Sequence, residues 1–108
     1  MGAVGTPHGM EGGIMPNFTV TQIVDGDTFD VSPSWIWSNQ TGDRVRPAGY
    51  DAPEVGTPGA AAATARLSQL ILNQQIELRE AHRIDRGRLV CEVHYRGRNL
   101  KDYFLAYR

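Results

Sequence analysis

The chain has 108 residues, of which 41% are hydrophobic and 21% are charged, and its formal net charge is −1. This length suits one domain with a modest core, and no apolar run approaches the ~20 residues that would span a membrane. The single cysteine, Cys91, excludes an internal disulfide framework, and one cysteine with three scattered histidines disfavours a zinc site.

Residues 1–17 are rich in glycine and show neither a helical nor a strand period. We expect them to form a disordered leader, either native or added for expression, with Met15 as a plausible native start. They contain no basic stretch followed by an apolar one, so we expect no secretory signal among them. The sequence therefore predicts one domain over residues 18–108 and does not specify a compartment.

The first predicted strand spans 18–24 and ends at Asp25-Gly26, a pair that favours a tight turn. A strand resumes over 28–31, and Pro33 should weaken it because proline cannot donate to a central ladder. A polar loop is predicted over 38–43, followed by a strand that begins at Arg44.

Two tryptophans, Trp35 and Trp37, are spaced so that both side chains lie on one face of a strand. We favour packing on the barrel, because aromatic residues are common in strands. The alternative is an exposed platform on which nucleic-acid bases stack.

A helix is predicted after Thr57, which can cap it, with Pro58 at its first position and Asn73 closing it. Its buried face is an apolar stripe at helical spacing: Ala63, Leu67, Leu70 and Ile71.

Two more strands are predicted, over 75–80 and 89–95, and the second ends at the turn pair Arg96-Gly97. A short amphipathic helix should end the chain, with its apolar face formed by Leu100, Tyr103, Phe104 and Tyr107. Five strands with one helix between the third and fourth indicate a small α+β barrel. This count fits a five-stranded Greek-key barrel, the OB-fold.

Three short motifs carry the candidate chemistry: Asp25-Gly26-Asp27-Thr28, then Arg46 followed by Asp51-Ala52-Pro53-Glu54, then Asp85-Arg86-Gly87-Arg88. Their order and spacing resemble the thermonuclease family, the staphylococcal-nuclease-like domains, over roughly residues 18–107. The third motif lacks the aromatic residue that the family usually has before the glycine. The resemblance implies an OB-fold and a Ca²⁺-dependent nuclease that cleaves the P–O5′ bond.

Asp27 and Asp51 are the expected metal ligands, together with the backbone carbonyl of Ala52. An oxygen-rich, incomplete shell suits Ca²⁺ better than a metal that prefers soft ligands. Each acid taken alone has an ordinary explanation, since Asp-Gly-Asp-Thr most often forms a hairpin turn. Asp25 is expected to cap that turn rather than bind metal.

Glu54 is the expected general base, and Arg46 and Arg88 are expected to hold the phosphate. A guanidinium suits this role because it stays charged and binds in a bidentate manner. Residues 1–78 carry three arginines against eight acids, and residues 79–108 carry eight basic residues against four acids. This asymmetry suits a site for a metal and a phosphate, although solvated surface charge explains it equally well.

Three functions remain open from the sequence. The favoured one is a Ca²⁺-dependent phosphodiesterase that cuts DNA and RNA with little sequence preference, acting as a monomer on single strands or nucleotides. The second is a catalytically weak nucleic-acid-binding OB-fold. The third is a protein-interaction domain that uses the tryptophans and the terminal aromatics as its contact patch.

Overall fold

The apolar alternation at the start of the domain forms the first hairpin of a β-barrel. In a computed structural model, which describes residues 15–108, β1 (Met15–Asp25) pairs antiparallel with β2 (Thr28–Trp37). Asp25 faces Thr28 in the register, so the turn consists of Gly26 and Asp27. The predicted turn is therefore confirmed, and it presents Asp27 at one end of the hairpin.

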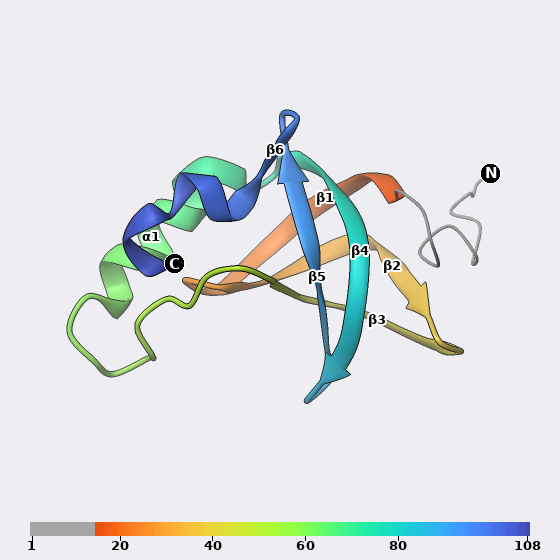
Figure 1. Ribbon diagram of the computed structural model, residues 1–108, viewed down its shortest axis with the longest axis horizontal. Coiled ribbons are helices and arrows are strands. Elements are labelled where there is room, and N and C mark those ends of the chain that lie inside the picture. The colour runs from red at the N-terminus through yellow and green to blue at the C-terminus, as the bar shows by residue number, and fades with distance from the viewer. Residues whose placement is uncertain (1–14) are drawn as a thin grey trace.

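Five strands close into a mixed barrel (Figure 1). β3 (Gln40–Pro47) pairs antiparallel with β2, and β4 (Gln75–Asp85) pairs antiparallel with β1. β5 (Arg88–Tyr95) pairs antiparallel with β4 and parallel with β3, which completes the ring. In that last pairing Arg46 lies opposite Val90. Barrel closure thus brings the strand that carries Arg46 beside the strand that begins at Arg88.

Several strand boundaries differ from the prediction. The predicted loop over 38–43 is wrong, because Ser38 and Asn39 alone make the turn, with φ of 53° and 61°, and β3 begins at Gln40. β4 continues to Asp85, five residues beyond its predicted end. β1 begins at Met15, which pairs with Leu78, so the strand starts inside the predicted leader. The rest of that leader, residues 1–14, lies outside the described residues.

The helix α1 (Ala60–Ile71) lies between β3 and β4 in the chain, as predicted, and it buries Ala63, Leu67 and Ile71. Its predicted start is wrong: Gly59, with φ of 88°, is the cap, and Thr57 instead donates to the carbonyl of Glu54 at 2.5 Å. Its end is confirmed, since Asn73 adopts a φ of 66° just beyond it. Figure 1 shows α1 and the C-terminal turns together at one end of the barrel.

The predicted C-terminal helix is wrong. The chain forms a short strand β6 (Arg98–Asn99) and two 3-10 turns, η2 (Leu100–Tyr103) and η3 (Leu105–Tyr107). The Asn99 side chain caps η2 at the N–H of Lys101, and Phe104, with φ of −130°, separates η2 from η3. Leu100 and Phe104, two residues of the predicted apolar face, are nevertheless buried in the core.

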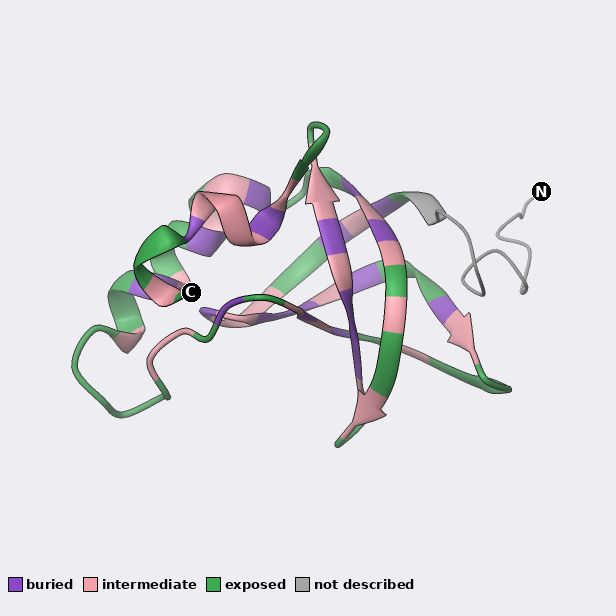
Figure 2. Ribbon diagram, viewed as in Figure 1, coloured by how far each residue is buried: buried purple, intermediate pink, exposed green. Residues whose placement is uncertain are grey.

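Along most strands the buried positions alternate with less buried ones (Figure 2), whereas Leu89, Val90 and Cys91 are buried in succession on β5. Trp35 is only 2% exposed, and its indole N–H donates to the carbonyl of Arg44 at 2.9 Å. Trp37 is partly buried and packs against the same core, so the prediction of packing rather than stacking is confirmed for both tryptophans. No helix in residues 15–108 is long and apolar enough to cross a membrane.

Gly26 lies where the first turn, the loop after β3 and α1 meet. A Cβ at this position would lie 2.6 Å from the Cβ of Ala52 and 2.7 Å from that of Ala63. We expect Gly26→Ala to destabilise the protein by about 1–3 kcal/mol, because overpacking forces backbone shifts. Thermal melting measures this, and Gly26→Ala combined with Ala63→Gly should recover part of the loss. Equal melting temperatures for wild type and Gly26→Ala would show that the three segments can move apart at Gly26 without loss of stability.

Candidate active site

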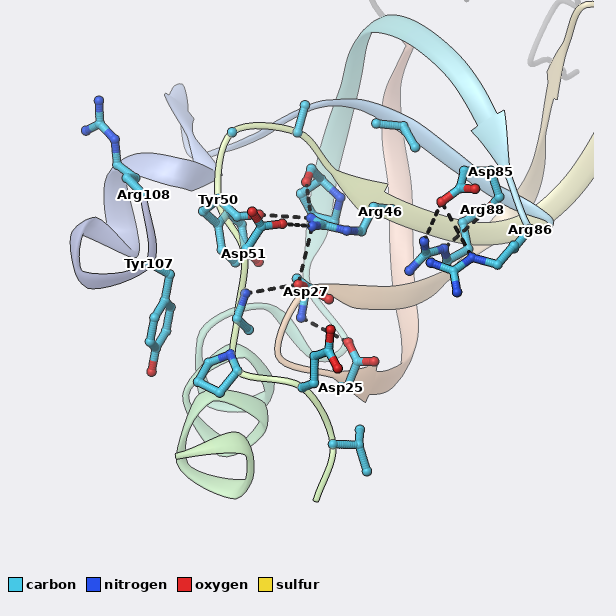
Figure 3. A pocket seen from close by; sticks show the side chains of 18 of the residues that line it. Asp25, Asp27, Arg46, Tyr50, Asp51, Asp85, Arg86, Arg88, Tyr107 and Arg108 are labelled. Carbon is cyan, nitrogen blue, oxygen red and sulfur yellow. Dashed lines mark hydrogen bonds and ion pairs between the residues drawn. The ribbon is translucent and has the colours of Figure 1, made fainter. Parts of the chain in front are cut away.

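The predicted site residues line one open cleft of about 940 Å³. Its walls are the β1–β2 turn, the loop after β3, the β4–β5 hairpin and the end of the chain (Figure 3). The structure therefore brings together all the residues to which the sequence assigned roles: Asp27, Arg46, Asp51, Ala52, Glu54 and Arg88.

Arg46 lies at the centre of the acidic part of the cleft. Its Nη2 contacts the carboxylate of Asp51 and lies 3.5 Å from Oδ2 of Asp27. Its Nη1 donates to the carbonyls of Pro47 at 2.8 Å and Tyr50 at 2.9 Å. These two backbone bonds fix the guanidinium against the turn that follows β3. As a result, two carboxylates from separate segments converge on one nitrogen atom.

Asp27 is the more enclosed of the two carboxylates, with a side chain 15% exposed against 85% for Asp51. Its Oδ2 accepts a hydrogen bond from the N–H of Ala52 at 3.0 Å. Burial raises the pKa of Asp27 above its usual value, although the Ala52 N–H and Arg46 act in the opposite direction. Asp25 accepts from the N–H of Asp27 at 3.1 Å, which confirms that it caps the turn.

The loop that carries Asp51 is held by the C-terminal segment. Tyr50 stacks on Phe104 with ring centroids 4.8 Å apart, and its hydroxyl donates to the carbonyl of Gly26 at 3.2 Å. The N–H of Asp51 donates to the carbonyl of Tyr107 at 2.9 Å. The end of the chain therefore positions the loop as well as lining the cleft.

Glu54 lies further along the same loop, on an exposed turn. Its backbone carbonyl accepts from both the N–H and the hydroxyl of Thr57, at 3.0 and 2.5 Å. Pro53 precedes it, so the backbone here is stiff and non-helical. Glu54 is exposed and lines the cleft, so water from the solvent can reach it.

Arg88 reaches the cleft from the opposite side. The β4–β5 turn consists of Arg86 and Gly87, with φ of 52° and 77°, which fits a two-residue hairpin turn. The Nη2 of Arg88 donates to the carboxylate of Asp85 at 2.7 Å, and its Nε donates to the Asp85 carbonyl at 3.3 Å. Figure 3 shows this group as separate from the cluster around Arg46. Arg88 is therefore held by its own hairpin rather than by the metal-candidate acids.

The Asp85 carboxylate competes with any other anion for the guanidinium of Arg88. The hydrogen bond from Arg88 is the main reason that the pKa of Asp85 lies below its usual value, with Arg86 also lowering it. This stabilising contribution is present at neutral pH, and it is lost only when acid protonates Asp85 as the pH falls through that lowered pKa. At neutral pH the Asp85 carboxylate therefore occupies Nη2 of Arg88.

We expect Asp85→Asn to bind phosphate ligands more tightly, because the amide holds Arg88 less strongly. An ion pair with a solvent-accessible carboxylate contributes little, so KM for an oligonucleotide should fall only by roughly two- to fivefold. Steady-state kinetics measure this, with Asp43→Asn on β3 as the control for the loss of one negative charge. A higher KM in Asp85→Asn would instead mean that Asp85 positions Arg88 productively.

The acids fit a hard cation in their chemistry. Asp27 and Asp51 both lie next to Nη2 of Arg46, and carboxylate oxygens are ligands that Ca²⁺ accepts. Within residues 15–108 no group of three His, Cys, Asp or Glu side chains is arranged to hold a metal, so further ligands would come from the backbone and water. Ala52 contacts Asp27 through its N–H, whereas its predicted ligand atom is the carbonyl oxygen.

Sequence reasoning missed the cleft residues Arg83, Tyr107 and Arg108. The only signal for the last two was their position at the end of an aromatic-rich segment. In comparisons with known proteins, no protein-family model and no curated protein matches the chain. The resemblance to thermonucleases therefore depends on the three sequence motifs alone.

Proposed function

We propose that this protein is a Ca²⁺-dependent phosphodiesterase that hydrolyses single-stranded DNA and RNA with little sequence preference. One observation carries the proposal: Asp27 and Asp51 converge on Arg46 in a cleft that Glu54 and Arg88 also line. No structural need of a small barrel brings these five side chains into one cleft, whereas phosphodiester hydrolysis uses all of them.

The strand order supports the assignment of an OB-fold. The barrel closes in the order β1–β2–β3–β5–β4, with a parallel pairing of β3 and β5 and a helix between β3 and β4. OB-folds bind oligonucleotides across one face of the barrel and its loops. A fold alone does not establish a function, so the proposal depends on the cleft.

In the proposed reaction Arg46 and Arg88 bind the scissile phosphate from two sides and neutralise the charge that develops on its oxygens. Glu54 accepts a proton from water as the water oxygen bonds to phosphorus and the P–O5′ bond breaks. The leaving oxygen takes a proton from solvent. Ca²⁺ held by Asp27 and Asp51 would supply positive charge to the phosphate. These groups all act on the backbone of the nucleic acid, which explains the expected lack of sequence preference.

Binding of nucleic acid without hydrolysis is the second candidate. The observation that favours it is the 2.7 Å hydrogen bond that holds Arg88 to Asp85, away from the Arg46 cluster. The protein-interaction function is less well supported, because Trp35 is buried and cannot belong to a contact patch.

Hydrolysis of a labelled single-stranded oligonucleotide tests the proposal. We expect turnover with Ca²⁺, much less with Mg²⁺ and none with excess EDTA, because Mg²⁺ requires a tighter octahedral shell than these few ligands provide. Equal turnover in Mg²⁺, or turnover that persists in EDTA, would contradict the assignment. Binding without turnover would favour the second candidate.

Thermal melting with Ca²⁺ and a nucleoside 3′,5′-bisphosphate provides a readout that does not depend on activity. Ligand at a hundredfold excess over its dissociation constant stabilises the folded state by about 2.7 kcal/mol. We expect a rise in Tm on the order of 10 °C for a domain of this size. The rise should vanish in Asp51→Ala and survive in Glu54→Gln, which keeps the shape of the side chain. An unchanged wild-type midpoint at saturating ligand would show that the acids do not bind metal.

A further inference from the structure

A group of arginines and tyrosines on β5, β6 and the C-terminal segment extends outward from the edge of the cleft. We call it the arginine–tyrosine surface, and its members are Tyr95, Arg96, Arg98, Tyr103 and Arg108. All three arginines are exposed, and the two tyrosines are partly exposed. No role in the proposed hydrolysis requires any of them, so their arrangement calls for a separate explanation.

The surface is ordered by stacking between cations and rings. The guanidinium carbon of Arg98 lies 4.6 Å from the ring centroid of Tyr103, and that of Arg96 lies 5.9 Å from the centroid of Tyr95. The two rings are 6.0 Å apart, and the Tyr103 hydroxyl donates to the carbonyl of Tyr95 at 3.1 Å. A guanidinium stacked on a ring keeps its in-plane N–H groups free for an anion.

The surface is continuous with the cleft. Arg108 lines the cleft and also pairs with Asp102 at 3.3 Å, while the backbone carbonyl of Asp102 accepts from Arg98 at 3.5 Å. Figure 3 shows Arg108 on the side of the cleft opposite Arg86 and Arg88. Arg96 and Arg98 do not line the cleft themselves. A ligand confined to the cleft therefore cannot reach them, whereas an extended chain that leaves past Arg108 can.

The charge of the surface identifies an anionic ligand. The surface contains three arginines, and Asp102 pairs with one of them, whereas the chain as a whole has a formal net charge of −1. Stacked arginines beside partly exposed tyrosines suit a polymer that carries both phosphates and flat bases. An acidic protein segment would satisfy the charges but would not use the planar guanidinium groups, on which a nucleic-acid base can stack.

We propose that the arginine–tyrosine surface binds the part of a single-stranded nucleic acid that extends beyond the cleft. This inference rests on the proposed function for its choice of polymer, and it makes the preferred substrate an oligonucleotide longer than the cleft holds. Arg96 and Arg98 bind backbone phosphates through their N–H groups, and their guanidinium planes, each supported by a tyrosine, offer stacking area to the bases.

The test is binding of labelled oligothymidylates of increasing length in EDTA, which stops the proposed hydrolysis. Arg96→Gln and Arg98→Gln should each make the slope of log K against log salt shallower by about 0.7, the value for one phosphate contact to a single strand. At 0.1 M salt each should bind a 12-nucleotide strand about fivefold more weakly. Arg44→Gln, which removes an exposed arginine from β3, is the matched control and should leave the slope unchanged.

Three results would overturn the inference. The first is an equal loss in Arg44→Gln. The second is an equal loss for a nucleoside 3′,5′-bisphosphate, which is too short to reach Arg96 and Arg98 from the cleft. The third is displacement of the oligothymidylate by polyglutamate as effective as by unlabelled oligothymidylate, which would indicate an acidic protein partner. Length-dependent binding without hydrolysis in Ca²⁺ would support the proposed role of this surface and exclude the proposed nuclease function. Hydrolysis whose kcat/KM does not change with strand length or in either variant would support the nuclease function and exclude the role of the surface.

Discussion

Arg46→Ala is expected to abolish most hydrolysis, with a rate reduction of about 10³-fold, equivalent to roughly 4 kcal/mol of transition-state stabilisation. Arg46→Lys should lose nearly as much. A single ammonium group cannot contact the phosphate in a bidentate manner while also bonding the carbonyls of Pro47 and Tyr50. Single-turnover hydrolysis at saturating Ca²⁺ measures the loss.

The same substitution should lower stability by about 2–3 kcal/mol, because it leaves the partly buried carboxylate of Asp27 without its counter-charge. The pKa of Asp27, already raised by burial, should rise further in Arg46→Ala. A raised pKa means that the folded state binds the proton more tightly than the unfolded state. The deficit should therefore shrink as the pH falls from 8 towards 5.

The control for Arg46 is its neighbour Arg44, which lies on the same strand with a side chain 45% exposed and pairs with Asp30. Arg44→Ala should change both rate and stability only slightly. Adding Asp27→Asn to Arg46→Ala should restore stability but not activity. Full activity in Arg46→Lys would show that only the charge of Arg46 is needed and would remove its proposed bidentate role.

Phe104→Ala is expected to have the largest effect on stability. Phe104 is 1% exposed and stacks on Tyr50, and the guanidinium of Arg66 lies 5.3 Å from its ring centroid. Truncating a buried phenylalanine costs about 3–5 kcal/mol, which for a domain of this size lowers Tm by roughly 15 °C or more.

Activity should also fall in Phe104→Ala at temperatures where the variant remains folded. Its ring supports Tyr50, and the C-terminal turns bond the backbone of Asp51 through Tyr107. The matched control is Leu105→Ala, which truncates the next residue, 66% exposed, and should leave both properties unchanged. Wild-type hydrolysis by folded Phe104→Ala would show that the end of the chain does not position the Asp51 loop.

The sequence predicted those features that depend on local pattern. Alternation located the strands, helical spacing located the buried face of α1, and turn residues located the ends of β1 and β5. The features that it missed depend on contacts between distant segments. The C-terminal helix was wrong because Phe104 leaves helical geometry to stack on Tyr50, a contact across more than fifty residues. No local propensity reports such a contact.

In the candidate site, too, the sequence predicted local features but not contacts between distant segments. The three motifs supplied the residue types, and the fold placed them in one cleft. The pairing of each arginine was not predictable, because Arg88 bonds Asp85 within its own hairpin while Arg46 bonds acids from two other segments. Side-chain partners depend on the turn geometry and on which neighbouring segment comes closest.

The parallel pairing of β3 with β5 has a consequence for the folding of the chain. It joins Val45 to Leu89 and Arg46 to Val90, partners that are more than forty residues apart in sequence. Contacts of such separation carry a large loop-closure entropy and tend to form late. Arg46 and Arg88 come into one cleft only through this pairing, so neither the first hairpin nor the β4–β5 hairpin alone contains a site. During synthesis, the proposed hydrolysis should therefore begin only once the barrel is complete.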